Sequence, residues 1–233
     1  MNFFLRLRLP GLYPFKKTSP QRISEITNRT NIMQKFEEQK FTIPELNGIS
    51  KKTIEEHLKL YAGYVKHANL ILEKIPEYSQ WTEKDPFVPY FTGELQRRFS
   101  FEFSGMRNHE YYFHSLEGGA KGLPEKSELK KALEAEWGSW DIWLARFKAI
   151  AMTRGIGWAM LYYDPVTKRL LNNWNDEQQL GHLIGLSPLL ALDMWEHSYL
   201  FDYVPSDKKK YIEAFFENLN WEVIDKNFTE AKK

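Results

Sequence analysis

The sequence of 233 residues contains no cysteine. Disulfides, thiolate nucleophiles and iron–sulfur clusters are therefore excluded, and His, Asp and Glu remain as the strong metal ligands. The sequence has no apolar run near the roughly 18 residues that a membrane-spanning helix needs. It also has little net charge, +1 from 32 basic and 31 acidic residues, and so lacks the basic field of nucleic-acid-binding proteins. We expect neither a membrane nor a nucleic acid as a partner.

What the sequence does contain, 42% hydrophobic and 27% charged residues, is typical of a globular protein with a good core. Residues 1–40 differ, because residues 1–32 hold many Lys and Arg but one acid, Glu25. We interpret residues 1–40 as a basic tail or an overlong start and expect a cytoplasmic protein. The alternative is that residues 1–32 are an organelle-targeting peptide, which would place the protein in an organelle matrix.

Residues 41–117 are predicted to form a hairpin of two long helices. Ser50 is a suitable N-cap, and apolar residues recur at helical spacing from Ile54 to about Lys74, where Pro76 is expected to end the first helix. The second helix is expected from about Thr92 to Leu116, after an extended loop marked by Pro86 and Pro89.

The glycine-rich stretch 117–124 predicts a boundary, and residues 118–233 are expected to form a second domain. Its pattern predicts helices at 127–137, 139–153 and 207–219, a hairpin of strands 158–163 and 169–174, and a short strand 188–192. The predicted fold class is α+β: a long helical hairpin, then a small three-stranded antiparallel sheet surrounded by helices.

Asp193 and His197 have the spacing of a metal site, because residues four apart share one face of a helix, and a helix is expected there. His57 and His109 lie in the two long helices. If these helices pack against the sheet, three imidazoles and one carboxylate can meet. The other histidines are predicted to lie elsewhere: His67 and His114 on other helical faces, and His182 in a loop as a minor candidate.

The segment Asp193-Met-Trp-Glu-His-Ser-Tyr199 resembles the Asp-x-Trp-Glu-His-x-Tyr signature of the iron/manganese superoxide dismutases. Further segments that resemble this family are Ile49–His57, Asn108-His109, Gly155–Trp158 and Asn220–Glu222, so the resemblance runs from about Phe41 to Asn227. It implies an enzyme that converts superoxide to dioxygen and hydrogen peroxide by redox cycling of one iron or manganese ion per subunit. The implied ligands are His57, His109, Asp193 and His197.

The resemblance also bears on the choice of metal. Gly105 stands where typical iron members have a glutamine, and Gln178 stands where manganese members have theirs. This pattern favours manganese, with Gln178 next to the metal-bound solvent. A shift of one residue would give that role to Gln179.

The resemblance implies roles for three further positions. Tyr64 is expected at the mouth of the site, with Tyr61 as the alternative, and Trp195 is expected to wall the pocket. Glu196 is implied at a subunit interface, which predicts a homodimer or a tetramer.

Two other functions are compatible with these residues. One is a catalytically inactive dismutase-like subunit of a larger assembly. The other is a non-haem iron oxygenase, although that class uses two His and one carboxylate.

Overall fold

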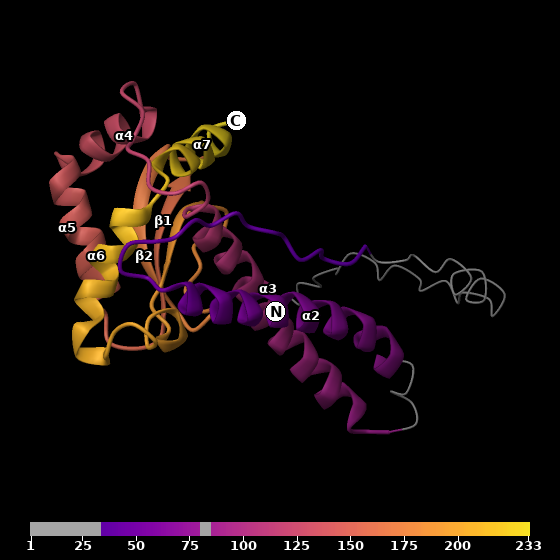
Figure 1. Ribbon diagram of the computed structural model, residues 1–233. Coiled ribbons are helices and arrows are strands. Elements are labelled where there is room, and N and C mark those ends of the chain that lie inside the picture. Colours follow the sequence, from indigo (N-terminus) through magenta and orange to yellow (C-terminus); the bar gives the residue numbers. More distant parts are fainter. Residues whose placement is uncertain (1–33, 80–84) are drawn as a thin grey trace, which may run out of the picture. The chain divides into compact units, whose positions relative to one another are not determined.

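Two long helices run antiparallel and side by side in the computed structural model, which describes residues 34–79 and 85–233 (Figure 1). They are α2, Lys51–Ser79, and α3, Val88–His114. The interpretations of residues 1–32 fall outside the described part of the chain. Residues 36–233 form one compact unit, and its division after residue 117 stays a prediction.

Both helices extend further than their prolines predicted. The helix α2 continues past Pro76 to its end at Ser79. A proline so close to a helix end removes one intrahelical hydrogen bond in a turn that is already incompletely bonded. The helix α3 begins at Val88 and takes Pro89 into its first turn, where the missing N–H has no intrahelical partner to lose.

The second half contains the three-stranded antiparallel sheet, in the order β2-β1-β3. Its strands are β1 Gly157–Asp164, β2 Arg169–Asp176 and β3 Ser187–Asp193. The central strand β1 is almost wholly buried, whereas Pro188 lies in the edge strand β3, where a lost ladder bond is tolerated. The helices around the sheet are α4 Glu128–Trp137, α5 Trp140–Ala151, α6 Lys208–Asn218 and α7 Trp221–Ala231. The predicted α+β fold class is confirmed.

Two features differ from the sequence prediction. Asp193 is the last residue of β3, and it is followed by the short 3-10 helix η1, Glu196–Ser198, so the expected α-helix carrying Asp193 and His197 was wrong. A second 3-10 turn, η2 Pro205–Asp207, precedes α6. The helix α7 was not predicted, although Asn220 caps it through a bond from the Glu222 N–H.

The helices fix the sheet relative to the hairpin. The helix α4 packs against β2 and α5 packs against β1 and β2, while α3 and α7 pack against β3. Because α3 contacts β3 directly, residues on its inner face lie opposite the end of that strand. No helix in the described part of the chain has the length and hydropathy needed to cross a membrane.

Gly157 at the start of β1 generates a prediction about stability. A Cβ at this position would overlap the backbone carbonyl oxygen of Asn175 on the neighbouring strand. Gly157→Ala should therefore lower the free energy of unfolding by about 2–3 kcal/mol, measured by denaturant titration. Gly63→Ala is the matched control, because nothing lies within 4 Å of its added Cβ; the helix should gain up to about 1 kcal/mol. Equal effects of the two substitutions would contradict this account.

Candidate metal centre

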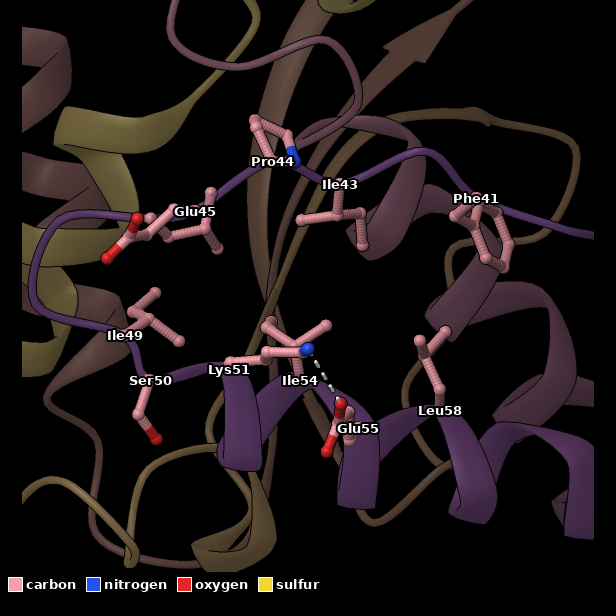
Figure 2. Close-up of a pocket in the computed structure, with 11 residues that line it drawn as sticks. Phe41, Ile43, Pro44, Glu45, Ile49, Ser50, Lys51, Ile54, Glu55 and Leu58 are labelled. Carbon is pink, nitrogen blue, oxygen red and sulfur yellow. Dashed lines mark ion pairs between the residues drawn. The ribbon is translucent and has the colours of Figure 1, made fainter.

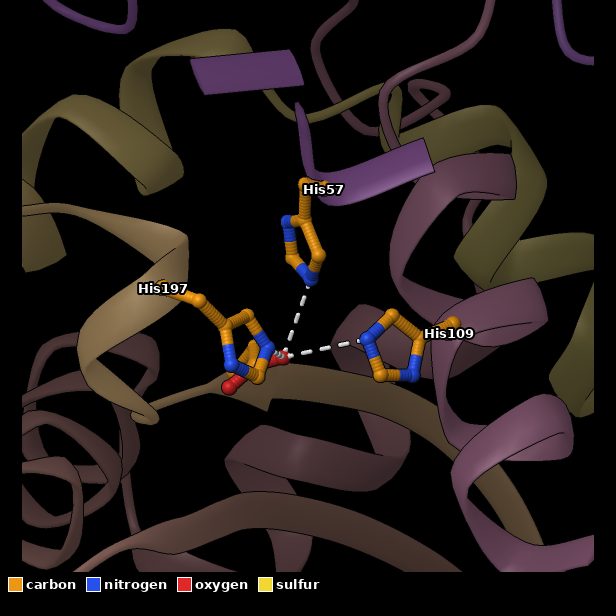
Figure 3. A group of neighbouring side chains, drawn as sticks. His57, His109 and His197 are labelled. Carbon is orange, nitrogen blue, oxygen red and sulfur yellow. Dashed lines mark hydrogen bonds and ion pairs between the residues drawn. The ribbon is translucent and has the colours of Figure 1, made fainter. Parts of the chain in front are cut away.

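Four side chains from four separate elements converge at the interface of the hairpin and the sheet (Figure 3). His57 comes from α2, His109 from α3 and His197 from η1, and their Nε2 atoms lie 3.1, 3.6 and 3.2 Å from Oδ2 of Asp193. One candidate ligand atom from each of the four residues lies within 4.8 Å of the others. His57, His109 and Asp193 are fully buried, while the side chain of His197 is 21% exposed.

The tautomer of His109 is fixed by its neighbour one turn earlier. Its Nδ1 is 2.6 Å from the backbone carbonyl oxygen of Gly105, which can only accept a hydrogen bond. The proton therefore sits on Nδ1, and Nε2 carries a lone pair. This buried Nε2 has no hydrogen-bond partner and points toward the Asp193 carboxylate. An orphaned imidazole lone pair aimed at a carboxylate fits a bound metal ion of the first transition row.

Burial determines the charge of the imidazoles. It lowers the pKa of His57, against an opposing hydrogen bond and charge from Asp193. It holds the pKa of His109 well below the ordinary value, helped by the nearby His57. Both rings are therefore neutral at neutral pH, as ligation requires, because a protonated imidazole has no lone pair to give.

Asp193 is held in place by several bonds. Burial by itself would raise the pKa of this carboxyl, but His197 and His57 outweigh that effect and hold the pKa well below its ordinary value. The backbone N–H of Trp195 donates to Oδ1 at 2.7 Å, so Oδ2 is left to face the imidazoles. The phenol of Tyr211 donates to the Asp193 carbonyl oxygen at 2.9 Å and anchors the backbone. Asp193 is thus an ionised, preoriented acceptor.

Gln178 and Tyr64 form a hydrogen-bonded pair beside these four residues. The Nε2 of Gln178 donates to the Tyr64 phenol oxygen at 3.0 Å, and its Oε1 accepts from the Trp158 indole at 2.9 Å. The Tyr64 ring lies 5.0 Å from the His109 ring, centroid to centroid. It rests against Gly105, where an added Cβ would be 2.7 Å from the Tyr64 ring. The tyrosine can occupy this position because residue 105 has no side chain.

Burial raises the pKa of Tyr64 strongly, and the negative charges of Asp193 and Glu102 raise it further. The phenol is therefore protonated at neutral pH.

Trp195 covers another side of the four candidate ligands. Its ring stacks on His197 with 5.7 Å between centroids and meets Phe101 edge-on at 6.3 Å. The indole also donates to the Glu177 carbonyl oxygen at 3.3 Å.

The remaining candidates lie away from the four residues. The Tyr61 phenol accepts from the Gln39 N–H and donates to Glu110. His114 pairs with Glu117 and Gln39, and half-exposed His67 is 3.8 Å from Glu102. Gln179 has no hydrogen bond to Tyr64 or Trp158, whereas Gln178 bonds to both. Glu196 is exposed in η1.

Two residues that contact Gln178 were not predicted in this role, since Asn108 was assigned none and His182 was only a minor candidate for the metal group. Asn108 and His182 both donate to the Gln178 backbone carbonyl oxygen, at 3.0 and 2.9 Å. Asn108 carried a signal, because it directly precedes His109. The spacing between Gln178 and His182 gave no such signal, because these residues do not lie in a helix.

A groove that does not include the four residues lies elsewhere on the protein. It has a volume of about 650 Å³ and lies between the N-terminal segment and the first turns of α2 (Figure 2). Phe41, Ile43 and Leu58 contribute apolar walls, and the Lys51–Glu55 ion pair, 3.6 Å between Nζ and Oε1, lies at its edge.

Comparison with known proteins identifies the family. Residues 124–227 match the model of the C-terminal domain of iron/manganese superoxide dismutases. An iron superoxide dismutase of Aquifex pyrophilus is 37% identical over 190 residues, which cover 81% of this chain and 88% of that protein. One from Cupriavidus metallidurans is 37% identical over 193 residues, covering 80% and 92%. A manganese superoxide dismutase of Haloarcula marismortui is 42% identical over 114 residues, covering 49% and 55%. With sequence identity at this level over most of both chains, this protein belongs to the iron/manganese superoxide dismutase family.

Proposed function

We propose that this protein is a superoxide dismutase that converts superoxide to dioxygen and hydrogen peroxide at one iron or manganese ion. The proposed ligands are His57, His109, Asp193 and His197. The observation that carries the proposal is the convergence of three imidazole nitrogens on one buried carboxylate oxygen. Zinc enzymes also use such ligands, so the redox assignment rests in addition on the relatives, which are named as iron or manganese superoxide dismutases.

An iron or manganese ion held by His57, His109, Asp193 and His197 would supply one-electron redox chemistry between two oxidation states. The protein orients the groups around it. Gln178 and Tyr64 form a hydrogen-bonded pair that we assign to solvent and proton handling, because Gln178 is buried, Tyr64 is partly buried and the phenol keeps its proton. Trp195 walls the pocket through its contacts with His197 and Phe101 and limits the entry of water.

Manganese is our preferred ion. Gln178, which comes from the loop after β2, is the glutamine next to Tyr64. The position in α3 from which iron members supply theirs is Gly105, and the Tyr64 ring fills the space over it. A glutamine at 105 would collide with that ring. The relatives include both iron and manganese enzymes, so the preference rests on these two positions.

We further propose a homodimer with Glu196 at its interface. Large apolar side chains are exposed around this glutamate: Leu200 and Phe201 follow η1, and Leu60 lies one turn after His57 on α2. Their exposed fractions are 47%, 51% and 41%. A two-fold contact would cover these apolar side chains and bring Glu196 of each subunit close to the His197 segment of the other.

Replacing His109 tests the ligand set. His109→Ala removes the orphaned Nε2 from the buried group, and we expect loss of bound metal by elemental analysis together with loss of superoxide removal. His67→Ala is the matched control, because that histidine is half exposed and outside the group. The control should keep both its metal and its activity. Full activity in His109→Ala would defeat the assignment, and activity without metal would defeat the redox proposal.

Replacing Gln178 tests the hydrogen-bonded pair. Gln178→Ala removes the donor to Tyr64 and the acceptor of the Trp158 indole, so we expect activity to fall about tenfold or more. The metal content should stay unchanged, because Gln178 is not a proposed ligand. Gln179→Ala should leave the rate near its original value. If Gln179→Ala lowers the rate and Gln178→Ala does not, the roles of the two glutamines are exchanged.

Loading the protein with a single metal tests the choice of ion. We expect the manganese-loaded protein to remove superoxide faster than the iron-loaded protein at equal metal occupancy, measured by elemental analysis and an activity assay on the same samples. Faster turnover with iron would overturn the manganese preference without touching the family assignment.

A further inference from the structure

We propose that His182 is a positioning residue that holds Gln178 in the orientation it needs beside Tyr64. This inference rests on the proposed function in treating Gln178 as part of the catalytic site. The contacts that carry it are a chain of hydrogen bonds among His182, Tyr162 and Asn175 that ends on the Gln178 backbone, whereas Tyr64 bonds to the Gln178 side chain.

The Gln178 backbone depends on side-chain bonds. Glu177, the preceding residue, has a φ of 50°, in the left-handed region that residues with a side chain rarely adopt. Such a conformation costs free energy and persists only when its surroundings impose it. Side chains from other parts of the fold donate hydrogen bonds to the backbone at this point. The Glu177 carbonyl oxygen accepts from the Trp195 indole, and the Gln178 carbonyl oxygen accepts from Asn108 and His182.

The tautomer of His182 follows from its partners. A backbone carbonyl oxygen can only accept, so Nε2 carries the proton it donates to Gln178. Nδ1 is then an acceptor, and it lies 2.9 Å from the Tyr162 phenol oxygen. Burial raises the pKa of Tyr162 to about 12, so this phenol retains the proton that it donates.

The outer end of the chain is also fixed. The Asn175 amide nitrogen lies 2.8 Å from the Tyr162 phenol oxygen and 3.0 Å from Nδ1 of His182, so it can donate to either. The Asn175 Oδ1 accepts from Asn173 at 2.5 Å, which determines which way the amide points. The strands β1 and β2 thus orient the His182 ring, and the ring orients the Gln178 backbone.

Asn108 and His182 tie the Gln178 carbonyl oxygen to different elements. Asn108 belongs to α3 and is adjacent to His109, so it ties Gln178 to the helix that carries a proposed ligand. His182 ties the same oxygen to the sheet through Tyr162. If the Asn108 donor is lost, the Gln178 loop can move relative to α3, and if the His182 donor is lost, it can move relative to the sheet. Either movement can separate the Gln178 amide from the Tyr64 phenol.

A pair of variants of equal size tests this inference. His182→Gln keeps a donor for the Gln178 carbonyl oxygen and an acceptor for Tyr162. His182→Glu, studied at pH 8 as the carboxylate, keeps the acceptor but loses the donor. The readout is the ¹³Cζ NMR resonance of Tyr64 in the full-length protein without added metal, assigned with Tyr64→Phe. This resonance reports the hydrogen bond that the phenol oxygen accepts from Gln178.

We expect His182→Glu to shift the Tyr64 resonance in the same direction as Gln178→Ala, and His182→Gln to restore it to its original position. In manganese-loaded protein, His182→Glu should lower the turnover number about tenfold at unchanged metal content. A Tyr64 resonance that moves in Gln178→Ala but not in His182→Glu overturns the inference, even if the variant is less stable, because His182 would then only brace its own loop.

If circular dichroism finds His182→Glu unfolded, His182→Leu replaces it with the same expected outcomes, because leucine also lacks a donor. The NMR measurement needs neither metal nor turnover. If the unsubstituted protein removes no superoxide, the proposed function is contradicted. The shift of the Tyr64 resonance still decides whether His182 positions Gln178.

Discussion

The approach of three imidazoles to one buried carboxylate oxygen is the constraint on which the rest of this structure depends. Asp193 is ionised and fully buried, and a buried charge is costly unless partners compensate it. Hydrogen bonds from His57 and His197 and the Trp195 N–H supply part of that compensation. A bound cation would supply more. The hairpin and the sheet must therefore dock closely enough for α2, α3 and the end of β3 to share this centre.

Hydrogen bonds from neighbouring residues fix the orientation of His109, Asp193 and Gln178. His109 is fixed through the Gly105 carbonyl oxygen, Asp193 through Trp195 and Tyr211, and Gln178 through bonds to both its side chain and its backbone. Gly105 serves twice, because its carbonyl oxygen sets the His109 tautomer and its missing side chain admits the Tyr64 ring. These supports come from α3, β1, α6 and the segment between β3 and η1, so both the helical hairpin and the second half of the chain contribute to the site.

Local signals predicted much of this architecture. The predicted helices 127–137 and 139–153 correspond to α4 and α5, which Ser127 and Ser139 cap, and the strand pattern predicted the sheet. The ligand candidates followed from a motif rather than from geometry: Asp193 and His197 meet although no α-helix joins them, because a strand end and a 3-10 turn bring them within 3.2 Å. The contacts of Gln178 with Tyr64 and His182 depend on tertiary packing and on Glu177 in a left-handed conformation, which no short sequence window encodes.

The order of the four residues along the chain has a consequence for biosynthesis. The bond between His57 and Asp193 spans 136 residues, and His197 comes later still. While the ribosome is still translating the region before residue 193, the nascent chain can form the helical hairpin, but it lacks two of the four groups. With the proposed ligand set, the complete site exists only after almost the entire polypeptide has been made, and the cellular compartment in which the finished chain folds decides which metal is at hand.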